Sequence, residues 1–135
     1  MSVDIYKLIE KAKKISISNT CSKHTNFSVG AVLVTKDNQI FTGINIENDG
    51  IQSICAERVA FVKALSEGYK DFKFMIVMGK KKDNKLFRKI FPCGYCRQFI
   101  SEYADKDFKI YTYSDTNKKI YEYKINELLP GNFKL

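Results

Sequence analysis

The sequence has no apolar run that approaches the ~18 residues of a transmembrane helix. Its first residues, Met1–Lys7, also lack the basic and then apolar pattern of a signal peptide. No internal repeat, low-complexity segment or linker divides the 135 residues. We therefore expect a single domain over residues 1–135, located in the cytoplasm and with no membrane partner. A chain of this length can bury a core without disulfides.

Arginine is scarce although the chain is basic. The formal net charge is +8, yet only Arg58, Arg88 and Arg97 among the 23 basic residues are arginine. Specific nucleic-acid sites favour arginine because its guanidinium binds bidentately. The lysines are scattered along most of the chain, so we expect no nucleic-acid partner. The densest basic run, 80–89, is predicted to be a solvated loop.

Cysteine occurs four times, and in the cytoplasm these thiols stay reduced. Reduced cysteines in a Cys-x-x-Cys spacing, as at Cys93 and Cys96, indicate metal or redox chemistry more than a disulfide.

Hydrophobic periodicity and turn residues predict a layered α/β fold around a mixed five-stranded sheet. The first two strands form an antiparallel hairpin, and the following strand–helix–strand–helix–strand segment is expected to be parallel. The predicted helices are 3–17, 56–67 and 93–103, with a helical turn at 127–129. The predicted strands are 29–35, 40–47, 72–79, 108–113 and 119–124. In the second strand the period of two places Asn45 and Glu47 on one face.

The two helices that follow the hairpin both start at cysteine. The first begins directly after Cys55 and has Glu57 as its second residue, and Cys93 and Cys96 lie in the first turn of the second. Helix N-termini lower thiol pKa values, which favours the thiolates that zinc needs. Three protein ligands leave the fourth tetrahedral position open for water, and a carboxylate that is not a ligand can move the protons of that water. The pattern resembles the three-cysteine form of the zinc deaminase signature.

Two further residues are candidates for tuning this site. Three thiolates on Zn²⁺ leave a formal charge of −1, which Arg58 is placed to offset. Gln98 is a candidate donor of a hydrogen bond to a cysteine sulfur.

Two other readings use the same cysteines. A structural zinc site could combine Cys21 and His24 with Cys93 and Cys96, which would explain the only histidine but leave Cys55 and Glu57 without a role. A thioredoxin-like redox role for the Cys-x-x-Cys segment also leaves them unused.

Five segments, in order, resemble the small, single-domain cytidine deaminases: residues 27–31 (FSVGA), 42–48 (TGINIEN), 55–58 (CAER), 92–98 (PCGYCRQ) and 128–131 (LLPG). The resemblance implies a three-layer α/β/α fold and a homotetramer. It also implies that cytidine or deoxycytidine is deaminated to uridine or deoxyuridine and ammonia by a zinc-bound hydroxide, in pyrimidine salvage and without an organic cofactor. The implied zinc ligands are Cys55, Cys93 and Cys96, with Glu57 as proton shuttle.

The same resemblance assigns the substrate contacts. It implies that Asn45 and Glu47 hold the ribose hydroxyls, that Phe27 packs against the pyrimidine, and that the backbone at Ala56 contacts the base edge. Phe133 lies where the family has an aromatic residue that reaches a neighbouring subunit's site.

The chain also departs from the family pattern. Lys23-His24-Thr25 replaces the usual Pro-Tyr-Ser, and the loop between Asn48 and Cys55 is one residue shorter than is typical. A shorter loop also occurs in the related blasticidin S deaminases, so a cytosine compound other than a nucleoside is the alternative substrate. A nucleic-acid substrate is a lesser alternative, because nucleic-acid deaminases more often use histidine as the first ligand.

Overall fold

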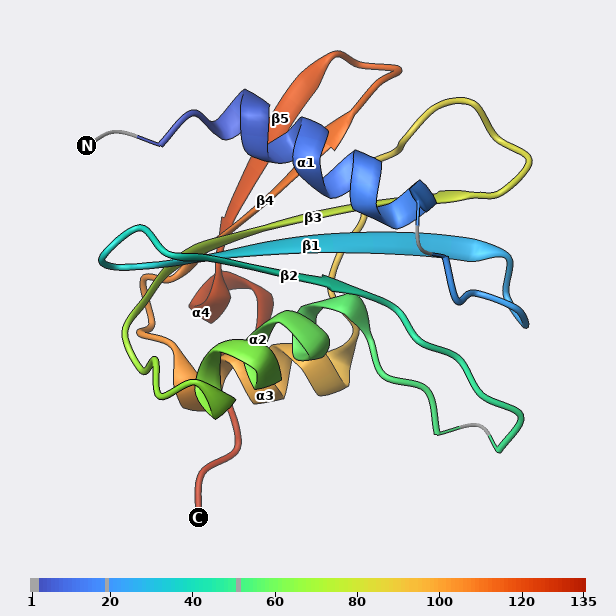
Figure 1. Ribbon diagram of the computed structural model, residues 1–135. Coiled ribbons are helices and arrows are strands. Elements are labelled where there is room, and N and C mark those ends of the chain that lie inside the picture. Colours follow the sequence, from blue (N-terminus) through green and yellow to red (C-terminus); the bar gives the residue numbers. More distant parts are fainter. Residues whose placement is uncertain (1–2, 19, 51) are drawn as a thin grey trace.

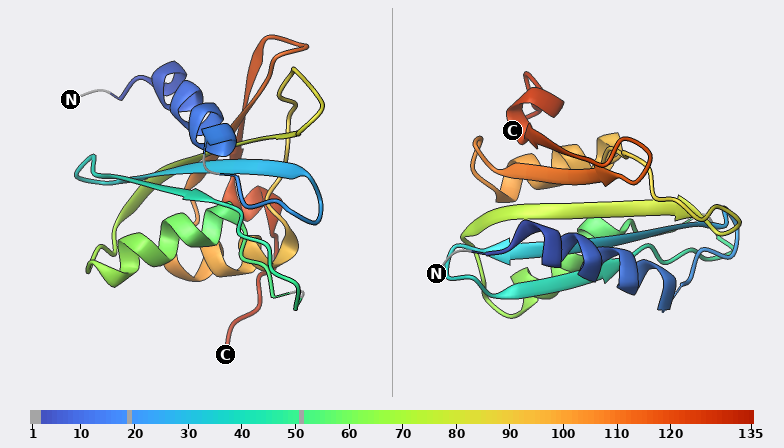
Figure 2. Two further views of the ribbon diagram at one scale, coloured as in Figure 1. Left: turned by 45° about the vertical axis from the view of Figure 1, so that its right-hand side comes forward. Right: turned by 90° about the horizontal axis from the view of Figure 1, so that it is seen from above.

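The computed structural model describes residues 3–18, 20–50 and 52–135. Five strands form one sheet in the order β2-β1-β3-β4-β5. Helix α1 covers one face of this sheet, and α2, α3 and the short α4 cover the other (Figures 1 and 2), which confirms the predicted three-layer α/β/α fold. The helices are α1 Ile5–Ser18, α2 Ala56–Ser66, α3 Gly94–Tyr103 and α4 Ile125–Leu128. The strands are β1 Phe27–Thr35, β2 Ile40–Ile44, β3 Phe72–Lys81, β4 Lys109–Ser114 and β5 Lys119–Lys124.

The sheet is mixed, as predicted. Strand β1 pairs antiparallel with both β2 and β3, whereas β3 and β4 are parallel and β4 and β5 antiparallel. Strands β2, β3 and β4 therefore run in the same direction, but β1 lies between β2 and β3. Because of this arrangement, the start of β1 and the ends of β2 and β3 meet at one end of the sheet, on the right in Figure 1.

Two glycines allow the helices to lie close to the central strands. A Cβ atom on Gly30 would come 2.2 Å from the carbonyl oxygen of Ala12 in α1, and one on Gly43 would come 2.3 Å from that of Ala56 in α2. The first turn of α2 thus lies directly on β2. This contact fixes the start of α2, where the cysteine and glutamate of the signature are located.

Apart from the end of β2, the element boundaries lie within two residues of the predicted ones. Strand β2 ends at Ile44 rather than at residue 47, because Ile46 instead forms an isolated bridge with Ile54 in the connection to α2. Helix α2 ends at Ser66, one residue before the predicted end, and the predicted stop residue Gly68 has φ +92° and donates its N–H to the carbonyl of Leu65. Across the described residues, none of the helices combines the length and apolarity required to cross a membrane.

A polar anchor joins α1, β4 and the segment that precedes α3. The carboxylate of Asp115 accepts hydrogen bonds from Lys13 Nζ and from the backbone N–H of Phe87, both at 2.8 Å. Burial alone would raise the pKa of Asp115, but these two hydrogen bonds outweigh it and hold the pKa below its ordinary value.

Replacing Asp115 with alanine is expected to lower the free energy of unfolding by roughly 1–3 kcal/mol, because it leaves the buried backbone N–H of Phe87 without its acceptor and removes one of the two acidic partners of Lys13. Since the pKa of Asp115 is depressed in the folded state, its contribution is present above the unfolded pKa of about 3.9 and is lost as the pH falls through the folded value. Urea unfolding at pH 7 and at about pH 3 measures both effects, with the exposed Asp83→Ala as control. An equal loss at both pH values would contradict this account.

Candidate active site

Three cysteine sulfurs meet at the starts of α2 and α3. Cys55 immediately precedes α2 and Cys93 immediately precedes α3, where its sulfur accepts a hydrogen bond from the N–H of Cys96. The sulfurs of Cys55 and Cys93 are 3.7 Å apart, and all three lie within 4.8 Å of one another. Within the part of the chain that the structure describes, this is the one group of three or more side chains that could hold a metal ion.

The spacing of the sulfurs fits zinc. Tetrahedral coordination with zinc–sulfur bonds of ~2.3 Å places two sulfurs about 3.8 Å apart, close to the separation of Cys55 and Cys93. Hydrogen bonds from Cys96, Arg58 and Cys93 lower the pKa of the Cys55 thiol to about 5. The pKa of the buried Cys96 is raised, because it shares its proton with the Cys55 sulfur. One thiolate is therefore already available to a metal at neutral pH.

Arg58 lies against this thiolate. Its Nη2 is 3.6 Å from the sulfur of Cys55, and its guanidinium carbon is 4.1 Å from the centre of the Tyr95 ring. The contact with Cys55 agrees with the charge-offsetting role predicted for Arg58. The stacking partner Tyr95 was not foreseen from the sequence, because nothing in the spacing shows that a residue between two cysteines faces α2.

Glu57 is buried, with 4 % of its surface exposed, and lies in the first turn of α2 beside the sulfurs. Burial, and to a smaller extent the nearby Cys55 thiolate, raise the pKa of its carboxyl to about 7, while a backbone hydrogen bond and Arg58 oppose the change. A carboxyl with a pKa near neutrality can both accept and donate a proton at physiological pH.

A pocket of about 490 Å³ opens above Glu57 and the sulfurs. Three segments line it: the start of β1, the connection from β2 to α2, and the connection from β3 to α3, which lie together at one end of the sheet (Figure 1). Among the predicted site residues it brings together Phe27, Asn45, Glu47, Cys55, Ala56, Glu57 and Cys93. Lining residues that were not predicted from the sequence are Thr25, Val29, Ser53, Ile54, Arg88, Lys89, Ile90 and Phe91.

Asn45 and Glu47 face the pocket together, as their spacing predicted. Asn45 is held on β1, since its Oδ1 accepts from the N–H of Val29 and its Nδ2 donates to the carbonyl of Phe27. Glu47 accepts hydrogen bonds from the backbone N–H groups of His24 and Thr25 and from the Thr25 hydroxyl.

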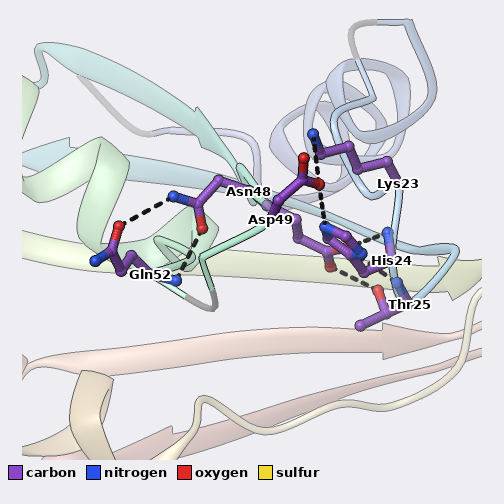
Figure 3. Close-up of polar contacts among 7 residues, drawn as sticks. Lys23, His24, Thr25, Asn48, Asp49 and Gln52 are labelled. Carbon is purple, nitrogen blue, oxygen red and sulfur yellow. Dashed lines mark hydrogen bonds and ion pairs between the residues drawn. The ribbon is translucent and has the colours of Figure 1, made fainter.

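Exposed ion pairs and hydrogen bonds extend this contact at the rim of the pocket. Asp49 lies 3.2 Å from both Lys23 Nζ and His24 Nε2, and Asn48 is hydrogen-bonded to Gln52 (Figure 3). The segment that replaces the family's usual Pro-Tyr-Ser is therefore tied to the connection that follows β2.

Comparisons with known proteins agree with this geometry. Residues 3–112 match the model of the cytidine and deoxycytidylate deaminase zinc-binding region. The chain belongs to this family.

Individual members of the deaminase family are similar over nearly the whole chain. A probable cytidine deaminase of Dictyostelium discoideum is 39% identical over 131 residues, which are 96% of this chain and 84% of that protein. A blasticidin-S deaminase of Bacillus cereus is 34% identical over 129 residues, 92% of this chain and 88% of that protein. The crystal structure of cytidine deaminase from Burkholderia pseudomallei superposes with a TM-score of 0.83 at 32% identity and covers 97% of this chain and 100% of that one.

The expected role of Gln98 in this deaminase-family site needs correction. Its Nε2 donates to the carbonyl of Phe133 (3.0 Å) and to Glu102 (3.1 Å), and its Oε1 accepts from the N–H of Phe133 (3.3 Å). Both amide protons are used away from the sulfurs, because Gln98 lies on the face of α3 that contacts the C-terminal segment. Gln98 instead holds the backbone of Phe133, a residue that is 64% exposed.

The alternative zinc site through Cys21 and His24 is not assembled. Cys21 is exposed, and neither residue joins the group formed by Cys55, Cys93 and Cys96 within residues 3–18, 20–50 and 52–135. The backbone of Cys21 pairs with Ile46 and its carbonyl accepts from the N–H of Glu47, so this segment supports the pocket rim.

Proposed function

We propose that this protein is a zinc-dependent deaminase that converts cytidine and deoxycytidine to uridine and deoxyuridine with release of ammonia, in pyrimidine salvage. One observation carries the proposal: a buried carboxyl with a pKa near 7 lies beside three convergent thiols at the floor of a pocket of nucleoside size. Family membership and the similarity to named cytidine deaminases support the same reaction.

Cys55, Cys93 and Cys96 would hold the zinc, and the spacing of their sulfurs fits it. When bound, zinc lowers the pKa of a coordinated water and so supplies a hydroxide nucleophile at neutral pH. Arg58 limits the excess negative charge of three thiolates, and Tyr95 holds its guanidinium in place by stacking.

Glu57 is proposed to move two protons. As a base it accepts a proton from the attacking water, and as an acid it delivers that proton to N3 of the cytosine ring. Glu57 then takes the proton of the hydroxyl group added at C4 and passes it to the amino group, so that the C4–N bond breaks, the C4 carbonyl forms and ammonia leaves. The raised pKa suits both directions, since the carboxylate and the carboxylic acid are both populated near pH 7.

The substrate would be held by the pocket walls. Phe27 would pack against the pyrimidine, and the backbone at Ala56 would contact the base edge. Asn45 and Glu47 would bind the ribose hydroxyls: one proton of the Asn45 amide makes only a long contact of 3.4 Å with Glu47, so a hydroxyl can replace that contact.

We further propose that residues 1–135 form one domain that assembles as a homotetramer in the cytoplasm, where the thiols stay reduced. Phe133, exposed in the single chain, would then reach the pocket of a neighbouring subunit. Light scattering on the purified, zinc-loaded protein measures the assembly.

The experiment that tests the function is an ultraviolet assay of the zinc-loaded protein on cytidine and deoxycytidine, with ammonia measured in parallel. Turnover of either nucleoside is expected. A folded, zinc-containing protein that releases no ammonia from either would exclude the nucleoside reaction. The same assay with blasticidin S tests the alternative substrate suggested by the shortened 48–55 loop and the Bacillus cereus relative.

A further inference from the structure

The segment that precedes β1 holds the carboxylate of Glu47 in place. Oε1 of Glu47 accepts hydrogen bonds from the backbone N–H groups of His24 at 2.8 Å and Thr25 at 3.0 Å. Its Oε2 accepts a hydrogen bond from the Thr25 hydroxyl at 2.6 Å. Burial alone would raise the pKa of Glu47, but these hydrogen bonds outweigh it and hold the pKa below its ordinary value. Glu47 is therefore an ionised acceptor at neutral pH.

The Thr25 hydroxyl links the parts of the pocket that the proposed function assigns to the base and to the sugar. Its single proton goes to Glu47, because the carbonyl of Phe27 is farther away, at 3.4 Å. Its oxygen accepts a hydrogen bond from the N–H of Phe27 at 3.0 Å. The carbonyl of Phe27 accepts in turn from Asn45 Nδ2 at 2.8 Å. Both polar groups of the Phe27 backbone are thus joined to the proposed sugar-binding residues, one of them through Thr25.

The segment that carries Thr25 is fixed on both sides. Before it, Lys23 Nζ and His24 Nε2 each lie 3.2 Å from the carboxylate of Asp49, on the connection from β2 to α2 (Figure 3). After it, the carbonyl of Asn26 accepts a hydrogen bond at 2.8 Å from the backbone N–H of the first residue after β3. Exposed ion pairs contribute little by themselves. The hydrogen bonds of Thr25 are therefore expected to be the contacts that orient Glu47.

Glu47 keeps one acceptor position for a ligand. A carboxylate offers about four lone-pair positions, and the hydrogen bonds from His24 and Thr25 occupy three of them. The remaining contact, from Asn45 Nδ2 to Oε2, is long at 3.4 Å. A sugar hydroxyl can replace this contact while Oε2 stays turned towards the pocket. Without the Thr25 hydroxyl, the carboxylate could rotate about its contacts at Oε1, and water could take the free position.

We infer that Thr25 is a positioning residue of the sugar subsite, whose hydroxyl orients the Glu47 carboxylate so that Oε2 accepts a sugar hydroxyl. The inference rests on the proposed function, which assigns Asn45 and Glu47 to the ribose hydroxyls, and it adds the residue that determines how strongly one of these contacts forms. Thr25 acts through Glu47 and not on the base. Its loss therefore weakens the binding of nucleosides that carry sugar hydroxyls and spares nucleosides that lack them.

The test measures the dissociation constants of uridine and 2′,3′-dideoxyuridine for the zinc-loaded protein by ligand-observed NMR titration. The two compounds differ only in the 2′ and 3′ hydroxyls, and neither has an amino group to lose, so turnover does not disturb the measurement. Wild-type protein is expected to bind uridine more tightly. Thr25→Val, which replaces the hydroxyl with a methyl group, is expected to weaken uridine binding by roughly 5-fold or more and to leave 2′,3′-dideoxyuridine binding unchanged.

Two further variants serve as controls. Thr25→Ser keeps the hydroxyl and should restore the preference for uridine. Thr42→Val should keep the wild-type constants, because the Thr42 hydroxyl also lies near a charged group, 3.5 Å from Lys63 Nζ, but is outside the pocket lining. Thr25 is exposed, so its variants are expected to fold.

A loss confined to uridine and reversed in Thr25→Ser supports the inference. Equal weakening of both compounds in Thr25→Val would mean that Thr25 only maintains the pocket rim, and unchanged or tighter uridine binding would mean that its hydroxyl competes with the sugar. Either result overturns the inference, as does a wild-type protein that binds both compounds equally. The proposed function is decided separately, by the release of ammonia from cytidine, which none of these binding measurements requires.

Discussion

Replacing Glu57 with glutamine is expected to lower kcat on cytidine by at least ~10²-fold while zinc stays bound. Glutamine has nearly the same shape as the carboxylic acid but can neither accept nor release a proton under these conditions. Among the described residues that line the pocket, the other carboxyl is Glu47, which already accepts hydrogen bonds from His24 and Thr25, so it is not expected to take over both transfers.

The measurement is steady-state ultraviolet kinetics together with metal analysis of the same samples. Glu67→Gln is a matched control, since Glu67 is exposed and lies at the opposite end of the same helix. A Glu57→Gln protein with full zinc content that keeps more than a tenth of the wild-type kcat would remove Glu57 from the proton transfers. If the Glu57→Gln protein loses its zinc, Glu57→Asp takes its place in the test. Aspartate retains a carboxyl group, but its shorter side chain holds that group farther from the reacting atoms.

The part of this site that could be predicted from the sequence is the part set by local structure. Cys55 and Glu57 are two residues apart at one helix start, and Cys93 and Cys96 are three apart at another, so helix geometry alone fixes their relative positions. The pairing of Asn45 with Glu47 was predicted from the period of a strand over 40–47, and the two residues do line the pocket together although β2 ends at Ile44.

What could not be predicted depends on contacts between segments far apart in the chain. Arg88 lines the pocket because Phe87 is anchored to Asp115 and because Arg88 itself bridges to Gly79. The lysine-rich sequence around Arg88 indicates neither of these contacts. The contact between Gln98 and Phe133 depends likewise on how the C-terminal segment returns to α3. The sequence spacing correctly placed Gln98 on the helix that follows Cys93, but the predicted hydrogen bond to a cysteine sulfur was wrong.

Replacing Cys55 or Cys96 with serine is expected to abolish tight zinc binding. A serine hydroxyl does not ionise near neutral pH and is a poor zinc ligand, whereas each cysteine supplies one of three sulfurs within 4.8 Å. Removing a residue that only forms a hydrogen bond to a metal ligand typically lowers metal affinity 10–100-fold. Removing a ligand itself should therefore lower zinc affinity by at least ~100-fold.

Cys21→Ser is the matched control, because Cys21 is exposed and outside the sulfur group while its backbone contacts do not depend on the side chain. Competition with a chromogenic chelator measures the affinity of each variant, and circular dichroism verifies that each remains folded. The expected order is wild type equal to Cys21→Ser, and both far above Cys55→Ser and Cys96→Ser. If zinc were lost only from Cys21→Ser, the metal would be structural and bound elsewhere. Glu57 would then have no metal-bound water to deprotonate, and the proposed reaction would lose its nucleophile along with its site.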